Sequence, residues 1–105
     1  MPEWVRVAGV ADCKDEGCLH RTLDNGDAVV LARWEGEIFA LEDRCSHEDF
    51  PLSDGEVDNG EIECVLHGAR FDLQTGKAVQ LPAIRPVKTF PVEIRDEEVF
   101  IRVDL

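Results

Sequence analysis

Short strand-like runs separated by strong turn signals constrain the fold of this chain more than any other feature of its sequence. No amphipathic helical pattern continues over three turns, so the periodicity favours strands over helices. The pair Asn59-Gly60 tolerates the positive φ angles that tight hairpins demand. The expected strands span residues 4–8, 18–23, 28–34, 38–43, 56–58, 61–65, 70–73, 87–95 and 99–103. Strands at this spacing predict an all-β fold, an antiparallel β sandwich or barrel.

The chain has 105 residues, which is close to the usual size of one domain. We therefore expect residues 1–105 to form a single domain. A hydrophobic content of 44% is enough for a small packed core. The run at residues 28–34 is almost continuously apolar, and we expect it to be buried on both faces.

Acidic side chains occur along the whole sequence and give a formal net charge of -12 at pH 7. This negative field repels nucleic acid and anionic membrane surfaces, which are bound mainly by clustered Lys and Arg. We therefore expect neither as a partner. No apolar run is long enough to span a bilayer, and residues 1–4 lack the pattern of a signal peptide, so we expect a cytoplasmic location.

Two short segments concentrate the residue types that bind metals. They are Cys45-Ser46-His47 and Cys64-Val65-Leu66-His67, with sixteen residues between His47 and Cys64. Each segment follows an expected strand, so two neighbouring loops can place four thiol and imidazole groups together. A lone Cys is usually a small buried hydrophobe, and a lone His often binds nothing. Two Cys/His pairs at this spacing nevertheless favour a metal site.

The spacing alone leaves the metal open. Two Cys and two His can complete a closed tetrahedral zinc site. Common zinc modules, however, pair Cys with Cys in one loop and His with His in the other, whereas each loop here carries one of each. This mixed arrangement favours two iron ions over one zinc ion.

Other conspicuous residues are interpreted as structural. Cys13, Cys18 and His20 lie outside both metal-binding segments and have no partner motif of their own. Five large aromatic residues fall within expected strands, where such side chains normally build the core. They are Trp4, Trp34, Phe39, Phe90 and Phe100.

The order C-x-H, sixteen residues, C-x-x-H resembles the signature of the Rieske family of [2Fe-2S] proteins. The resemblance continues beyond these positions. Residues 64–72 look like the second cluster loop, Thr75-Gly76 like the hairpin that follows it, and Leu81-Pro82-Ala83 like the proline loop that covers the cluster. The resemblance implies a small cluster-binding subdomain made of two loops, at about residues 44–82.

By this resemblance, Cys45 and Cys64 bind one iron of a Rieske [2Fe-2S] cluster, and His47 and His67 bind the other. Two ferric ions, two sulfides and two thiolates sum to zero charge with neutral imidazoles. Such a cluster therefore accepts an electron more readily than an all-cysteine cluster. The imidazoles then offer the exit for the electron if their outer edges reach the surface.

Departures from the high-potential members of the family predict a low reduction potential. The respiratory members carry a disulfide between the two loops, whereas this chain has Phe50 and Leu66 at the matching positions. Those members also place serine and tyrosine hydroxyls near the sulfurs, where this chain has Ala69 and Phe71. Hydrogen bonds to sulfur raise the potential, so we expect a value near the bottom of the range of about -150 to +300 mV.

The resemblance implies a ferredoxin, a soluble one-electron carrier rather than an enzyme. It is similar to the ferredoxin components of bacterial ring-hydroxylating dioxygenase systems. The expected partners are a flavoprotein ferredoxin reductase and a terminal oxygenase, which a monomer with an acidic surface meets briefly. Two alternatives stay open: a Rieske protein of iron–sulfur assembly or redox sensing, and a structural zinc module that presents a binding surface.

Overall fold

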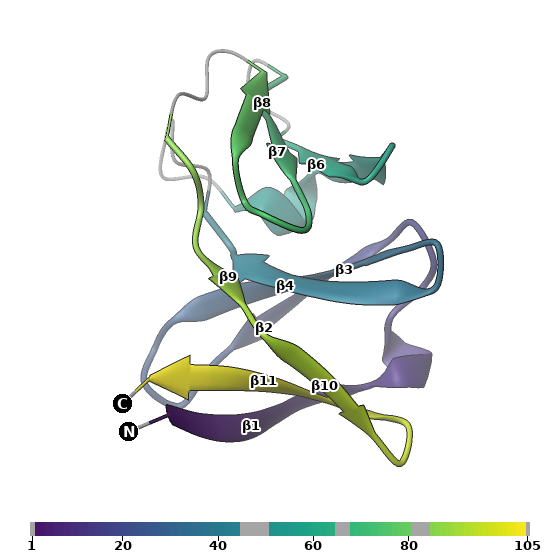
Figure 1. Ribbon diagram of the computed structural model, residues 1–105, viewed down its shortest axis with the longest axis vertical. Coiled ribbons are helices and arrows are strands. Elements are labelled where there is room, and N and C mark those ends of the chain that lie inside the picture. The colour runs from purple at the N-terminus through teal and green to yellow at the C-terminus, as the bar shows by residue number, and fades with distance from the viewer. Residues whose placement is uncertain (1, 45–50, 65–67, 81–84, 105) are drawn as a thin grey trace.

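Three antiparallel sheets make up the structure, a computed structural model that describes residues 2–44, 51–64, 68–80 and 85–104 (Figure 1). The first sheet contains, in order, β1 (Pro2–Gly9), β11 (Glu98–Asp104) and β10 (Val92–Arg95). The second contains β2 (Cys18–Thr22), β3 (Ala28–Trp34), β4 (Glu37–Glu42) and β9 (Thr89–Phe90). The third contains β5 (Glu56–Asp58), β6 (Glu61–Glu63), β7 (Arg70–Asp72) and β8 (Ala78–Gln80).

Helical structure in the described residues is limited to two short 3₁₀ helices, η1 (Val10–Asp12) and η2 (Leu52–Asp54). The predicted all-β class and the antiparallel pairing are therefore confirmed. Within the same residues, no helix is long and apolar enough to cross a membrane.

The second sheet is the middle layer of the molecule, between the first and third sheets (Figure 1). Successive side chains of a strand point to opposite faces. Val29 and Leu31 of β3 belong to the core shared with the first sheet, whereas Val30 and Ala32 belong to the core shared with the third. The expected burial of both faces of residues 28–34 is thus confirmed at its centre, and it explains why polar residues do not alternate there.

The core between the second and third sheets fixes the third sheet on the middle layer. Phe71 of β7 and Ile62 of β6 are completely buried there. The other buried members of this core are Val30, Ala32, Leu41, Leu52, Val57, Cys64, Ala69, Leu73 and Val87. Side chains from both sheets and from the connecting segments therefore hold the sheet that carries the second Cys/His segment.

The expected single strand at residues 87–95 is wrong, because Pro91 divides it. β9 pairs with β4 of the second sheet, and β10 pairs with β11 of the first. Proline has no N–H to donate, but its carbonyl accepts a hydrogen bond of 3.0 Å from the N–H of Arg102. The chain uses Pro91 to pass from one sheet to the next.

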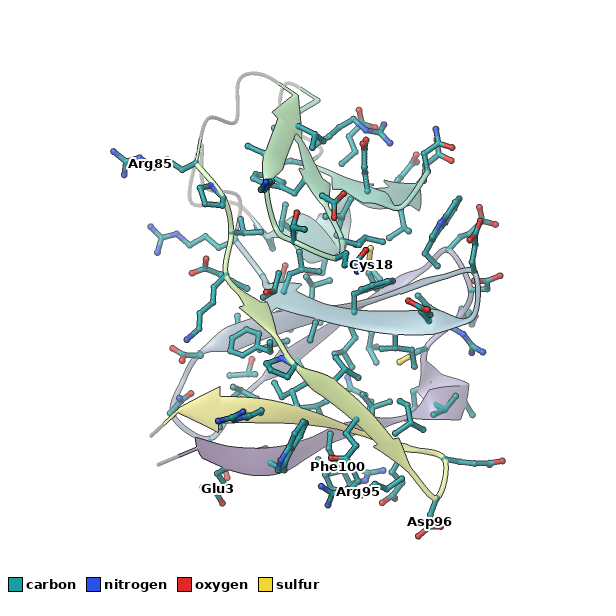
Figure 2. The ribbon with its side chains drawn as sticks, in the orientation of Figure 1. Glu3, Cys18, Arg85, Arg95, Asp96 and Phe100 are labelled. Atoms are coloured by element: carbon teal, nitrogen blue, oxygen red, sulfur yellow. The ribbon has the colours of Figure 1, made fainter. Side chains whose placement is uncertain are left out.

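Two other expectations differ from the structure. Trp4 does not build the core: its side chain is exposed, and the Arg95 guanidinium lies over its ring at 5.7 Å. Figure 2 shows Arg95 close to Phe100, whose ring it also covers, at 5.0 Å. The short strand β8 was not expected.

Candidate metal centre

The structure describes one of the four predicted ligands, Cys64, together with the frame that carries both loops. Cys45, His47 and His67 lie outside the described residues. So do Phe50, Leu66 and Leu81-Pro82-Ala83. Within the described part of the chain, no three His, Cys, Asp or Glu side chains form a group that could bind a metal ion.

The second loop joins β6 to β7. Cys64 directly follows β6 and is only 1% exposed. Its backbone N–H donates a hydrogen bond of 2.7 Å to the carbonyl of Ala69, which directly precedes β7. This bond closes the loop at its base, while the pairing of Glu63 with Arg70 continues the hairpin below it. Cys64 therefore has a fixed backbone and a side chain removed from water.

The first loop starts after β4 and returns through η2. Asp43, just beyond β4, accepts two hydrogen bonds from Ser53 of η2. The Ser53 backbone N–H lies 2.7 Å from Oδ1, and its hydroxyl lies 2.6 Å from Oδ2. The two ends of the first loop are thus joined by one side chain.

Gly55 brings the return of the first loop against the start of the second. A Cβ atom at this position would lie 1.7 Å from the carbonyl oxygen of Glu63, the residue before Cys64. No side chain fits at that distance. The next residue, Glu56, pairs with Glu63 in the β5–β6 ladder. The bases of the two loops are therefore neighbours, as the sequence interpretation requires.

The segment that returns from the expected proline loop is held against the same sheet. The N–H of Val87 donates to the carbonyl of Gly76 at 2.9 Å. Gly76 has a φ of 76°, and a Cβ there would lie 2.2 Å from the carbonyl oxygen of Val87. Arg85 projects outward just before this contact (Figure 2). The hairpin expected at Thr75-Gly76 thus anchors the chain that leads into β9.

Carboxylates surround the described part of the site. A hollow of about 370 Å³ lies beside Cys64. It is lined by Asp54, Gly55, Glu56, Glu63, Cys64 and Gly68. Arg70 offsets part of this charge, because its Nε lies 2.7 Å from Oε1 of Glu61 and its Nη1 lies 3.9 Å from Oε1 of Glu63. The three carboxylates at the hollow favour cationic groups on a partner.

The cysteines outside the loops fit the structural interpretation. Cys13 is buried in the core between the first and second sheets, whereas Cys18 packs against the core on the other side of the second sheet. No disulfide joins them. Burial, with a smaller contribution from Asp43, raises the pKa of the Cys18 thiol to about 11, and burial also raises the pKa of Cys13. Burial therefore keeps both thiols protonated to a higher pH than an exposed cysteine.

Sequence reasoning missed Asp43, Ser53 and Gly55. Asp43 is the only buried charged residue in the described part of the chain. A lone Asp after a strand looks like an ordinary turn residue, so its role becomes visible only through its contacts. Gly55 gave a weak signal, because an isolated Gly next to a strand can mark a close approach of two backbones.

The comparison with protein families decides what the site holds. The sequence matches the Rieske [2Fe-2S] domain over residues 3–91. The chain belongs to the Rieske [2Fe-2S] family. Its cofactor is a Rieske [2Fe-2S] cluster, as expected, and not the zinc ion that the spacing had left open.

Relatives of this Rieske protein are named as ferredoxins. It is 42% identical over 98 residues to the 3-phenylpropionate/cinnamic acid dioxygenase ferredoxin subunit of Photorhabdus laumondii, covering 92% of this chain and 91% of that protein. The solved structure of Sphingomonas yanoikuyae B1 ferredoxin has a TM-score of 0.92 at 34% identity, covering 97% of this chain and 100% of that one. A chain from the solved structure of a complex of reduced oxygenase and oxidized ferredoxin in carbazole 1,9a-dioxygenase has a TM-score of 0.88 at 28% identity. The match covers 93% of this chain and 91% of that one.

The described residues fit a Rieske cluster. Cys64 is a buried member of an apolar core to which the completely buried Ala69 and Phe71 also belong. The loop bases meet at Gly55, which allows ligands from both loops to converge. Two thiols and two imidazoles are also the donor set that the family uses.

Proposed function

We propose that this chain is an electron carrier that delivers single electrons to the terminal oxygenase of a ring-hydroxylating dioxygenase system. The proposal is carried by its similarity, over nearly the whole chain, to proteins named as ferredoxin components of such systems. An oxygenase partner is supported by the matched chain from the oxygenase–ferredoxin complex. These relatives are electron-transfer subunits rather than catalytic oxygenases, so we assign no catalytic residue.

We propose Cys45, His47, Cys64 and His67 as the four ligands of the cluster. When bound, the cluster accepts and releases one electron. The chain supplies the thiolates and imidazoles, holds Cys64 in place through the Ala69 carbonyl, and keeps water from it by burial. About residues 44–82 then form the cluster-binding part of a single domain at 1–105, supported by two cores that share the middle sheet.

We further propose a low potential within the family's range. Ala69 and Phe71 are both completely buried, and neither carries a hydroxyl that could donate to a sulfur. Loss of such hydrogen bonds lowers the potential of an iron–sulfur cluster. A low potential suits electron delivery to an oxygenase.

The other parts of the proposal concern the setting of the reaction. A flavoprotein ferredoxin reductase supplies the electron, and the protein acts as a monomer in the cytoplasm. The acidic charge supports short-lived encounters with basic surfaces on both partners. A reductase is required because nothing in the chain's own chemistry generates the electron.

The test compares two cysteine variants of the purified protein. The wild type is expected to contain about two irons and two labile sulfides per chain and to give an EPR signal after reduction. Cys64→Ala should lose most of the iron, whereas the matched control Cys18→Ala should retain it, because that neutral thiol lies outside the loops. Iron retained in Cys64→Ala would contradict the ligand assignment.

The carrier role is tested by reconstitution with a ferredoxin reductase and a terminal oxygenase from such a system. Product should form only when loaded protein is present, and Cys18→Ala should support turnover as the wild type does. A loaded wild type that supports no turnover, but forms a redox-dependent stable complex with an iron–sulfur assembly protein, would replace the carrier role with assembly.

A further inference from the structure

Asp43 is a charged group in a place where the fold would normally exclude one. Its side chain has no solvent exposure, and it is the only buried charged residue in the described part of the chain. Burying a carboxylate costs several kcal/mol unless its oxygens are hydrogen-bonded. Here both carboxylate oxygens accept hydrogen bonds, which offset the cost of burial.

Three donors converge on this carboxylate from two different elements. The N–H and the hydroxyl of Ser53 come from η2, and Nδ1 of His20 comes from β2, 2.5 Å from Oδ2. The opposite ring nitrogen of His20 lies 3.2 Å from the hydroxyl of Thr22. The imidazole, which is half exposed, is thus held in one orientation.

The backbone of Asp43 does not need this carboxylate to stay in place. Its N–H already donates to the carbonyl of Ala28 at 3.0 Å, which extends the pairing of β4 with β3. What the side chain adds is the link to Ser53, which ties the outgoing and returning ends of the first loop. Asp43 precedes Cys45 by two residues, and Ser53 follows residues 45–50 by three.

We propose that Asp43 is a positioning residue of the cluster site. With Ser53 and His20 it forms a clamp around a buried carboxylate, which fixes both ends of the first loop and, through them, the geometry of the ligands Cys45 and His47. The inference rests on the proposed ligand set. Groups behind metal ligands orient them, and their removal typically weakens metal retention by about 10- to 100-fold.

The clamp makes two variants informative for separate reasons. Asp43→Asn keeps the size of the side chain but loses one acceptor oxygen. Ser53→Ala removes only the hydroxyl bond and leaves the backbone N–H and the charge of Asp43 unchanged. If the two residues act as one clamp, the double variant should show less than the sum of the single effects.

The experiment measures iron release from the loaded protein to a chelator, with the midpoint potential and the EPR g-values after reduction. Asp43→Asn should release iron about 10- to 100-fold faster, with shifted potential and g-values. Ser53→Ala should change the iron release rate, the midpoint potential and the g-values in the same direction by a smaller amount. Asp24→Asn, the same charge change in the exposed turn after β2, should match the wild type.

A merely structural role would give a different pattern. A lower melting temperature with wild-type iron release, potential and g-values in loaded Asp43→Asn would overturn the proposal. If Asp43→Asn fails to fold, Ser53→Ala and His20→Gln decide, and wild-type values in both would overturn it. A wild type without about two irons would instead refute the proposed cluster function, so the two failures are distinguishable.

Discussion

Gly55 sets how closely the bases of the two Cys/His loops approach each other. Its φ of -90° is accessible to any residue, so only the space around it excludes a side chain. A Cβ would overlap the Glu63 carbonyl, 1.7 Å away, in the residue before Cys64. Neither atom can move without shifting the β5–β6 ladder.

Gly55→Ala is therefore expected to damage both the fold and the site. Forced overpacking of this kind costs about 1–3 kcal/mol. We expect the free energy of unfolding in urea to fall by about this amount, together with a lower iron content per chain. The two measurements are made on the same preparation.

The control for this variant is Gly9→Ala at the end of β1. Its φ is -88°, and the nearest atom to a Cβ there is Oδ2 of Asp12 at 3.3 Å, the end of an exposed side chain that can move. We expect a small change in stability and full iron content. Equal losses in both variants would show that the contact with Glu63 has no special role.

At the level of elements, the β10–β11 hairpin contains a strained turn. Asp96 and Glu97 have φ angles of 48° and 63°, although neither is glycine. In the turn between β5 and β6, Asn59 and Gly60 also both have positive φ angles, of 52° and 71°. Asn and Gly are residue types that adopt this conformation readily. A left-handed conformation costs a non-glycine residue about 1–2 kcal/mol.

Glu97→Gly should therefore stabilise the protein. Relief of the strain is worth about 1–2 kcal/mol. Glycine also makes the unfolded chain more flexible, which costs about 0.4–1 kcal/mol of stability. We therefore expect the free energy of unfolding in urea to rise by about 0.5–1 kcal/mol. The hydrogen bond from the Val10 N–H to the carbonyl of residue 97 uses the backbone and remains. Glu97→Ala keeps the Cβ and should give no such gain; an equal gain would assign the effect to loss of the carboxylate.

The elements that the sequence could predict are those with local signals. The Asn59-Gly60 turn and the apolar run at 28–34 depend on nearby residues, and both are confirmed. The sheet change at Pro91 was missed, because proline limits pairing but does not identify the partner strand. The role of Asp43 was also missed, because it depends on partners that are distant in the sequence. Its carboxylate is bonded by Ser53 of η2 and His20 of β2.

For the site, the spacing of Cys and His was sufficient to identify the family, since ligand number and order are properties of the sequence. The sequence could suggest that the loop bases lie close together, but it could not show what brings them there. Their closeness depends on the approach of Gly55 to Glu63, a packing detail between two elements. The ligand assignments of Cys45, His47, Cys64 and His67 remain predictions.

In the whole molecule, the sheet that carries Cys64 lies at one end and the first sheet at the other (Figure 1). The longest dimension is 37 Å. Carboxylates occur at both ends: Glu56 lines the hollow beside Cys64, whereas Asp96 lies at the far tip of the β10–β11 hairpin (Figure 2). The acidic charge is therefore not confined to the end that carries Cys64.

Electron transfer to a basic partner surface should consequently slow as salt is added. Charges are screened beyond about 30 Å at 0.01 M salt and beyond about 10 Å at 0.1 M. At low salt the whole net charge of -12 attracts the partner, and at high salt only carboxylates near the contact do. Stopped-flow rates should fall with ionic strength, while reduction by an uncharged chemical donor should not. Glu56→Gln should lower the rate at 0.1 M more than Asp96→Asn, because Glu56 lies beside Cys64. Equal effects of the two variants would place the contact elsewhere, and a rate that rises with salt would contradict a basic partner surface.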